Sequence, residues 1–571
     1  MHLNIRAKKQ HTYDAIVIGT GISGGWAMKE LTEKGLRVLA LERGRMVEHV
    51  KDYPTALKAP WEMPHRGRLA HAYKAENPFV VRSGVVNEYN QHFFVPDSQH
   101  PYVEEKPFTW VRGYQVGGKS LLWGRWTQRW GVGDFEANAR EGIAVDWPIR
   151  YPDLAPWYSY VEKFAGISGN KDGLAQVPDG EFLPPMEMNC FEQYMKGQIE
   201  SKLKGRHLII SRHANLSRAE PQHTAVGRGP CQYRNLCGRG CPYGAYFSTN
   251  SATLPAAQQT GRLTLLPDSV VHSILYDEQK GRATGVRVTE ATTRAVTEYY
   301  ARIIFVNAST VNTNLLLLNS TSARFPAGLG NDSGTLGKYV MDHNYRVSGV
   351  GYYDGLPDKY YYGRRPVGLY VPRFRNFGTD MQTAFQRGYA LAGGTARLGF
   401  ERGMQTAGLG AGFKDGLSGP GPWMMAFTAM GEMLPYEDNR ISLDPDRKDA
   451  WDMPLVRFHV SWHGNEDAMS RDAVEQVGET LAAGGLRDIH VSDKHVHPGQ
   501  GIHEMGGCRM GRDPKTSMLN AWNQLHAVKN VFVTDGACMT SSACQNPSLT
   551  YMALTARAAD HAVTELKKRN L

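Results

Sequence analysis

The feature that most constrains the fold of this chain is a glycine triplet directly behind a short apolar run. Residues 15–18 (AIVI) predict a buried strand of a parallel sheet. Gly19, Gly21 and Gly24 follow this strand at G-x-G-x-x-G spacing, and residues 26–34 predict a helix. A strand, a glycine turn and a helix in this order are typical of a doubly wound α/β domain.

Each of the three glycines has a physical role in such a turn. Gly19 permits the tight turn, Gly21 lets a pyrophosphate approach the backbone, and Gly24 lets helix and strand pack closely. Residues 37–41 predict a second strand, and Glu42 closes it 18 residues after Gly24, where an acid accepts hydrogen bonds from ribose hydroxyls. We therefore predict a dinucleotide site, with a purely structural glycine turn as the alternative. The motif alone does not separate FAD from NAD.

A second junction between a strand and a helix lies near the end of the chain. Residues 530–534 (NVFVT) predict a strand, Asp535 and Gly536 follow it, and residues 551–568 predict a helix. The N-terminus of such a helix is another place for the negative part of a cofactor. Upstream, His503 stands beside a glycine-rich stretch, where it is either a loop residue or a catalytic base.

The bulk composition excludes several classes of protein. At roughly 150 residues per domain, a chain of 571 residues forms about two to four domains. The net charge of +9 is spread along the chain without a basic run interleaved with aromatics, so nucleic-acid binding is not expected. The longest apolar stretches are too short to span a membrane. The polar residues 1–14 lack the apolar core of a signal peptide, which taken alone predicts a cytoplasmic protein.

Three of the seven cysteines form a cluster. Cys231, Cys237 and Cys241 have C-x5-C-x3-C spacing, and three converging thiolates suit iron with bridging sulfides. A four-iron cluster normally needs four cysteines, and no fourth cysteine lies nearby in the sequence. The three cysteines therefore favour a 3Fe-4S cluster. One alternative is a Cys₃His zinc site completed by His213 or His223. The other is a Cys237–Cys241 disulfide.

Taken together, these motifs resemble the glucose–methanol–choline (GMC) oxidoreductases. They occur in the family's order along almost the whole chain. The matching residues are Gly19, Gly21 and Gly24 with Glu42; Gly117, Gly118, Lys119 and Ser120; His503 in His-x-x-Gly-Gly-x-x-Met-Gly; and Asp535 and Gly536 with Asn546, Pro547 and Ser548.

The resemblance implies an α/β fold with a doubly wound FAD-binding domain and an interleaved β-sheet substrate domain. Residues 12–150, 225–345 and 495–571 would form the FAD-binding domain. Residues 151–224 and 346–494 would form the substrate domain with the segments next to the cluster. Some members attach FAD to a histidine after the Gly-Gly-x-Ser turn. Residues 120–124 (SLLWG) contain none, so we expect FAD without a covalent bond.

In the family, His503 matches the histidine near the flavin, and Asn546 matches its His or Asn partner. An imidazole with a pKa of about 6.5 accepts a hydroxyl proton near neutral pH, and Asn546 would hydrogen-bond the developing alkoxide. Asp535 would lie by the flavin ribityl or pyrophosphate group, with a helix-capping acid as the alternative. We further expect five residues to bind FAD: Gly117, Gly118, Ser120, Gly536 and Pro547.

The cysteine spacing resembles that of the cluster-bearing bacterial sugar dehydrogenases of this family, and the C-terminal segment resembles the glucoside 3-dehydrogenases. That resemblance implies oxidation of carbon 3 of glucosides, with glucose carbon 1, gluconate or a polyol as alternatives. It also implies a c-type cytochrome acceptor and a small partner subunit that carries the export signal, hence a periplasmic enzyme, with the cytoplasm as the alternative location. An oxygen-using oxidase, and a flavin-containing lyase or non-catalytic flavin-binding subunit, are the competing interpretations.

Overall fold

The computed structural model describes residues 11–361, 365–404 and 406–571. Most of the polar N-terminal segment discussed above, residues 1–10, lies outside the described residues. Within the described ranges, no helix has the length and apolar character that crossing a membrane requires.

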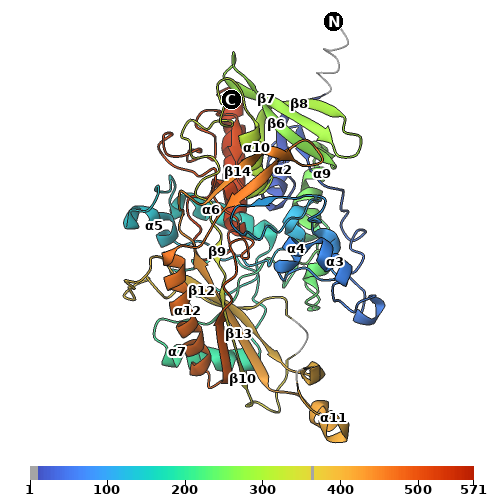
Figure 1. The fold of residues 1–571 in the computed structure, drawn as a ribbon, viewed down its shortest axis with the longest axis vertical. Helices are drawn as coiled ribbons and strands as arrows, with labels where there is room; N and C mark the ends of the chain where they lie inside the picture. The colour runs from blue at the N-terminus through green and yellow to red at the C-terminus, as the bar shows by residue number, and fades with distance from the viewer. Residues whose placement is uncertain (1–10, 362–364, 405) are drawn as a thin grey trace.

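The first sheet forms the upper part of the molecule in Figure 1. Its strands have the order β5-β2-β1-β8-β7-β6, with β17 paired to β8. They are β1 (Thr12–Ile18), β2 (Val38–Leu41), β5 (Leu263–Leu266), β6 (Ser269–Asp277), β7 (Arg282–Glu290), β8 (Val296–Val306) and β17 (Val531–Val533). Strands β5, β2, β1, β8 and β17 are parallel, whereas β6 and β7 are antiparallel.

Both faces of this sheet are covered, which explains why β1 reads as a continuous apolar run. Ala15 and Val17 belong to a buried cluster with Leu31 of α2 (Ile22–Glu33). Ile16 and Ile18 belong to a cluster on the other face. Parallel strands with two covered faces have no polar side to alternate with.

Two helices begin earlier than the sequence indicates. The first, α2, begins at Ile22 instead of residue 26, because its first turn already forms through a hydrogen bond of 2.7 Å from Gly25 N to Gly21 O. The second, α13 (Ser548–Lys567), begins directly after Pro547 instead of at residue 551. In the first turns of α2 and α13, glycine or proline at or next to the turn leaves too few apolar residues to show a helical period. Backbone hydrogen bonds, and no apolar pattern, set the start of each helix.

The second sheet occupies the lower part of the molecule and is antiparallel. Its order is β16-β10-β13-β12-β11-β4, with β9 paired to β13. The strands are β4 (Ile209–Ile210), β9 (His343–Asn344), β10 (Val347–Tyr353), β11 (Leu369–Val371), β12 (Tyr389–Arg397), β13 (Trp423–Glu432) and β16 (Arg487–Asp493). The helices α7 (Cys190–Lys202) and α12 (Gly464–Ala483) pack on it.

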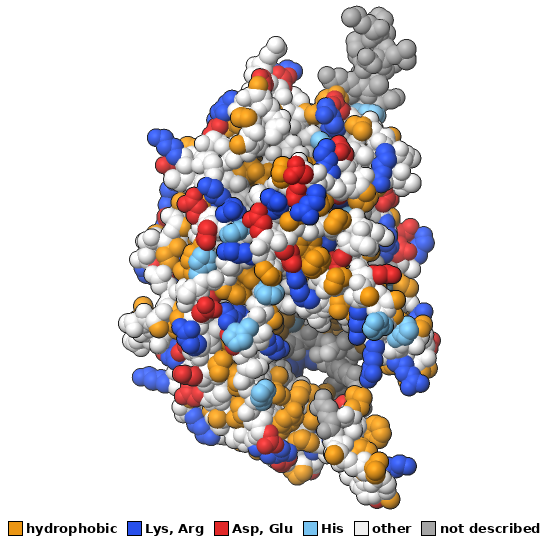
Figure 2. Space-filling view, viewed as in Figure 1, with side chains coloured by type: hydrophobic (Ala, Val, Ile, Leu, Met, Phe, Trp, Pro, Cys, Tyr) orange, Lys and Arg blue, Asp and Glu red, His pale blue; other side chains and the backbone are white. Residues whose placement is uncertain are grey.

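The remaining elements are a small sheet and the other α-helices. A small sheet joins β3 (Val103–Glu104), β14 (Arg440–Lys448) and β15 (Pro454–His459). The other helices are α3 (His71–Glu76), α4 (Pro78–Arg82), α5 (Val132–Glu141), α6 (Tyr151–Ala165), α8 (Pro221–Thr224), α9 (Leu254–Gln259), α10 (Thr310–Asn319) and α11 (Gly410–Ser418). On the face in Figure 2, basic and acidic side chains are interspersed.

The expected α/β class, with a doubly wound sheet and a second β-sheet region, is confirmed. All strands of the first sheet fall within residues 12–150, 225–345 and 495–571. Two elements outside those segments nevertheless pack toward the first sheet: α6 contacts α13, and β14 contacts α10. The domain boundaries themselves stay a prediction.

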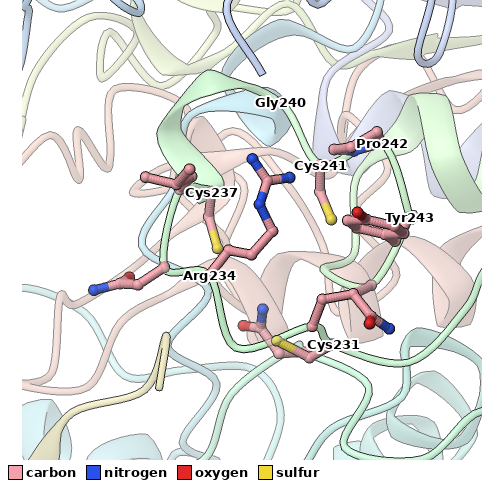
Figure 3. A pocket seen from close by; sticks show the side chains of 12 residues that line it. Cys231, Arg234, Cys237, Gly240, Cys241, Pro242 and Tyr243 are labelled. Carbon is pink, nitrogen blue, oxygen red and sulfur yellow. The ribbon is translucent and has the colours of Figure 1, made fainter. Parts of the chain in front are cut away.

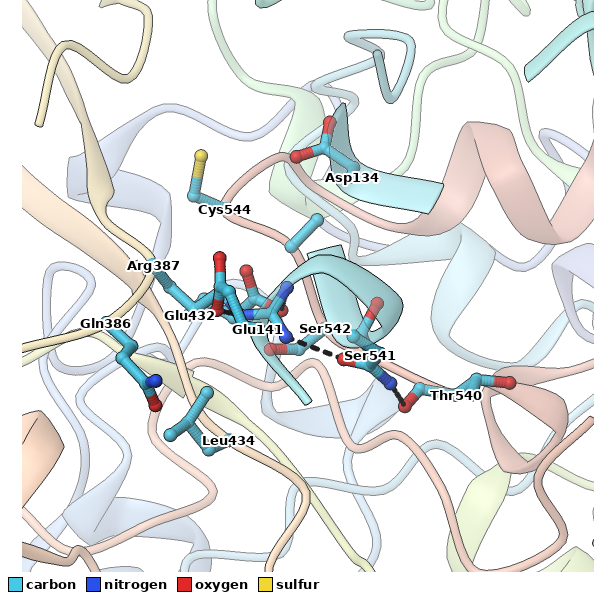
Figure 4. Close-up of polar contacts among 12 residues, drawn as sticks. Asp134, Glu141, Gln386, Arg387, Glu432, Leu434, Thr540, Ser541, Ser542 and Cys544 are labelled. Atoms are coloured by element: carbon cyan, nitrogen blue, oxygen red, sulfur yellow. Dashed lines mark hydrogen bonds and ion pairs between the residues drawn. The ribbon is translucent and has the colours of Figure 1, made fainter. Parts of the chain in front are cut away.

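A buried ion network connects the second sheet to α5. The guanidinium of Arg387 has no exposed surface and lies 2.8 Å from Glu141 and 3.8 Å from Glu432. Its Nη2 donates a hydrogen bond of 2.6 Å to Asn138, whose amide donates one of 3.1 Å to the carbonyl of Thr540 (Figure 4). The network therefore braces the loop that begins at Thr540.

We expect Arg387→Met to destabilise the protein strongly. The substitution leaves the buried Glu432 without one of its cations, and breaking a buried pair costs about 3–5 kcal/mol. The measurement is urea unfolding followed by circular dichroism. Arg324→Met is the control, because its pair with Asp332 is 51% and 43% exposed and such surface pairs contribute at most about 1 kcal/mol. Equal effects of the two substitutions would contradict the importance of the network.

Candidate active site

A cavity of about 730 Å³ lies between the two sheets. Ile18 and Leu41, at the carboxyl ends of β1 and β2, line one end of it, and small residues of the second sheet line the other. These small residues are Ala392, Gly393, Gly394 and Ala426. The edge formed by the carboxyl ends of parallel strands is the usual binding site of an open α/β sheet.

The glycine turn after β1 borders this cavity. Gly19 has a φ of +89°, which favours glycine, and a Cβ at Gly24 would lie 1.9 Å from the carbonyl oxygen of Gly19. A Cβ at Gly21 would meet nothing within 4 Å, and Gly21 lines the cavity. Gly24 therefore allows close packing, whereas Gly21 leaves space open at the N-terminus of α2.

Glu42 is held at the end of β2 by three donors. The backbone N–H and hydroxyl of Thr20 donate to its Oε2 at 3.1 and 2.6 Å, and the N–H of Gly44 donates to its Oε1 at 3.1 Å. Burial raises the pKa of Glu42 to about 6. The carboxylate keeps lone pairs for hydroxyl groups, which suits a ribose.

The segment from Gly117 to Ser120 lies opposite the glycine turn. Gly117 has a φ of +95°, and a Cβ there would lie 1.8 Å from Oδ1 of Asn250. Its carbonyl accepts a hydrogen bond of 2.6 Å from the Ser120 hydroxyl. Gly118 and Ser120 line the cavity, whereas Gly117 is not part of its lining.

Asp535 and Gly536 follow β17 at the same edge of the sheet. Asp535 caps the short helix Gly536–Cys538 by accepting a hydrogen bond of 3.0 Å from Ala537 N, and it accepts another of 2.6 Å from the Thr313 hydroxyl. Burial raises its pKa to about 6. Asp535 thus is a helix-capping acid and at the same time a residue of the cavity wall.

The polar lining of the cavity fits FAD. Eight buried polar side-chain atoms of lining residues make no hydrogen bond within the protein. Four belong to arginines, and the other four, which are left to a ligand, are Asn307 Oδ1, Glu504 Oε1, Asn546 Oδ1 and Tyr551 OH. Residues at the N-termini of α2, α10 and α13 line the cavity, and the basic Arg43, Arg112, Lys119 and Arg125 join them. Helix N-termini and cations both favour a pyrophosphate.

His503 and Asn546 lie together on the cavity wall. Nε2 of His503 is 3.2 Å from Nδ2 of Asn546, and its Nδ1 is 2.8 Å from Nδ1 of His343. The backbone N–H of His503 donates to Asp342 at 3.1 Å. Burial, with His343 and Lys119 nearby, lowers the pKa of His503 below its usual range. The imidazole is therefore neutral near pH 7 and able to accept a proton.

The structure brings most of the predicted site residues to one place, although their roles stay predictions. Ten of them line the cavity: Gly19, Gly21, Glu42, Gly118, Ser120, His503, Asp535, Gly536, Asn546 and Pro547. Sequence reasoning missed Asp342, His343 and Glu504. Asp342 and His343, at the start of the two-residue strand β9, stand in no spacing that marks them, and His343 lies 160 residues before its partner His503.

The three clustered cysteines line a separate cavity of about 30 Å³. Figure 3 shows Cys231, Cys237 and Cys241 around it, with the Arg234 side chain between Cys237 and Cys241. No group of three His, Cys, Asp or Glu side chains in the part of the chain that the structure describes is arranged to hold a metal ion. The structure therefore does not confirm the predicted cluster.

The alternative assignments of these cysteines find no support. All seven cysteines are free, so Cys237 and Cys241 form no disulfide. Both ring nitrogens of His223 contact backbone, at 3.1 Å from Glu220 N and 3.0 Å from Lys163 O. His213 does not line the cavity. Burial raises the pKa of Cys231 to about 11, and the three thiols have no reason to converge until a metal binds.

The chain is similar to known oxidoreductases along almost its whole length. Two models of the GMC oxidoreductase family match residues 13–345 and 435–555. The chain is 29% identical to the 2-methyl-1,2-propanediol dehydrogenase of Mycolicibacterium austroafricanum, over 96% of this chain and 94% of that protein. It is 26% identical to the fructose dehydrogenase large subunit of Gluconobacter japonicus, over 97% and 98%. In fold it resembles pyridoxine 4-oxidase from Mesorbium loti, with a TM-score of 0.60, 16% identity and coverage of 96% and 98%.

We expect Gly21→Val to lose FAD while the protein stays folded. The open space beside Gly21 accepts the new side chain, but that space is the predicted path of the pyrophosphate. Flavin absorbance per chain and the unfolding midpoint of the apoprotein are measured. Gly197→Val is the control, because a Cβ at Gly197 on α7 also meets nothing within 4 Å. Full flavin occupancy in Gly21→Val would argue against the site.

Proposed function

The chain belongs to the GMC oxidoreductase family, and on that premise we propose that it is an FAD-dependent dehydrogenase that oxidises a sugar ring hydroxyl to a ketone. It acts on CH–OH groups with FAD as the family's cofactor. One observation carries the proposal: His503 and Asn546 lie 3.2 Å apart on the wall of the same cavity that the glycine turn borders.

The residues of the cavity divide the chemistry among them. Alcohol oxidation removes a proton from oxygen and a hydride from carbon. Nε2 of His503 accepts the proton, and the Asn546 amide hydrogen-bonds the oxygen as negative charge develops. Bound FAD supplies the hydride acceptor. Glu42, Asp535 and the three helix N-termini would hold it in the cavity.

We propose carbon 3 of glucosides as the reacting position. The resemblance of the C-terminal segment to glucoside 3-dehydrogenases supports it, and the fructose dehydrogenase among the relatives supports a sugar. Glucose carbon 1, gluconate or polyol oxidation, and an oxygen-using sugar oxidase, are the alternatives. The test is anaerobic bleaching of the flavin by methyl glucoside, glucose, gluconate and sorbitol in parallel, with the product identified by NMR. Bleaching by glucose and not by methyl glucoside would favour carbon 1.

The electrons taken from the substrate must pass to an acceptor. We propose that a 3Fe-4S cluster held by Cys231, Cys237 and Cys241 receives them. The support is chemical: three free thiols line one small cavity. Such a cluster would take electrons singly and pass them to a c-type cytochrome partner. A small signal-bearing subunit would export the folded chain to the periplasm. The relative named as a large subunit supports a multi-subunit assembly.

His503→Ala is expected to retain FAD and to lower the rate of flavin reduction by substrate about 10²–10⁴-fold, because a general base is removed. Stopped-flow bleaching and flavin content are measured on the same preparation. His207→Ala serves as the control, since that side chain is 45% exposed and lies outside the cavity lining. A His503→Ala rate above half of the wild-type rate would contradict the assignment.

Cys237→Ser is expected to leave flavin reduction by sugar intact while reduction of a cytochrome c falls at least about tenfold. Hydride transfer needs only the cavity, whereas single-electron export needs the cluster. Iron per chain and the electron paramagnetic resonance signal are measured beside the rates. Cys190→Ser is the matched control, because Cys190 is also free and half-buried. Wild-type protein without iron would refute the cluster.

A further inference from the structure

We propose that His343 is a positioning residue that fixes the proton of His503 on Nδ1, so that the unprotonated Nε2 of His503 faces the cavity. His343 does not line the cavity itself and acts through His503. The inference rests on the proposed function for its consequence in turnover. The proton positions follow from the hydrogen bonds alone.

The argument starts at the far side of His343. Its Nε2 lies 3.2 Å from the carbonyl oxygen of Ser542 and 3.0 Å from that of Ala543. Carbonyl oxygens only accept hydrogen bonds. Nε2 of His343 therefore carries a hydrogen and donates it to this pair of carbonyls.

The ring of His343 is neutral, so its Nδ1 has a lone pair. The residue is completely buried, and burial lowers its pKa to about 4. The facing nitrogen, Nδ1 of His503, is 2.8 Å away with the two rings nearly perpendicular. Two nitrogens at this distance need one hydrogen between them, and it must come from His503. Nδ1 of His503 is the donor, and Nε2 is left as the base.

The orientation of Asn546 agrees with this assignment independently. A lone pair on Nε2 of His503 needs a donor opposite it, and the Nδ2 of Asn546 is the facing atom at 3.2 Å. The hydrogen bonds then run in one direction from Asn546 through His503 and His343 to the carbonyls of Ser542 and Ala543. The carbonyls of Ser542 and Ala543 lie four and three residues before Asn546. The backbone from Ser542 to Asn546 therefore closes this series of hydrogen bonds into a ring.

Backbone contacts hold this ring in place. β9 places His343 opposite Glu432 of β13, and the Ser542 hydroxyl bonds Met433 in both directions, at 3.1 Å from its N–H and 3.0 Å to its carbonyl. Next to His343, Asp342 accepts backbone N–H groups of Gly499, Gly501 and His503. Asp342 thus fixes the backbone of His503, and His343 fixes its imidazole.

Neutron crystallography of the holoenzyme tests the proton positions directly. We expect deuterium on Nδ1 of His503 and Nε2 of His343, and none on Nε2 of His503. Deuterium on Nε2 of His503 in the resting enzyme would overturn the proposal.

A matched pair of variants tests the consequence for the reaction. His343→Asn keeps an acceptor oxygen within reach of His503 Nδ1, and His343→Leu has nearly the same shape without an acceptor. We expect flavin reduction by substrate to fall about 100-fold in His343→Leu and to stay within about fivefold of wild type in His343→Asn. Flavin content and unfolding midpoint show whether each variant is folded.

The controls separate the possible failures. His526→Leu removes a histidine that bonds Ser517 at 3.1 Å outside the cavity, and its flavin reduction should be unchanged. Equal losses in both His343 variants with full flavin, or no loss in His343→Leu, would overturn the positioning role. If wild-type protein is reduced by no sugar or alcohol, the proposed function fails, and the neutron map still decides the proton positions. If His343→Leu does not fold, that map alone decides.

Discussion

Strand β8 makes the pairing on which the rest of the structure depends. Its residues Ile304 to Val306 pair with β1 on one side and with β17 on the other. This places the N-terminal glycine turn and Asp535, more than 500 residues apart in the chain, at one edge of one sheet. Because parallel strands end at the same edge, the pairing of the strands alone brings the glycine turn and Asp535 together. No direct contact between these two segments is needed. Closing such a long loop costs conformational entropy, which only extensive burial offsets.

The parts that depend on local backbone geometry were predictable from the sequence. The glycine turn, Glu42 and the strand before Asp535 follow from spacing alone, because a tight turn between a strand and a helix admits few residue types. The ends of helices were predicted less well. At Gly21 and Pro547 the first turn has no apolar period to read, and the hydrogen bonds of the backbone decide where each helix starts.

The parts that depend on distant contacts were not predictable. His343 reaches His503 only because β9 pairs with the end of β13. Arg387 meets Glu141 and Asn138 only because the segment before β12 lies beside α5. Neither residue stands in a recognisable pattern. The cysteine cluster shows the opposite case: its spacing is plain in the sequence, but without a metal nothing draws three half-buried thiols together.

The small residues of the second sheet decide how the cavity can change. Gly393 admits no side chain, since a Cβ there would lie 2.1 Å from the carbonyl of Ala426, whereas a Cβ at Gly394 meets nothing within 4 Å. The cavity wall formed by the second sheet can therefore be narrowed by a larger side chain at Gly394 without moving a strand. Relatives with the same sheet can therefore admit substrates of different width through the volume of the one side chain at position 394. His503 and Asn546 stay in place.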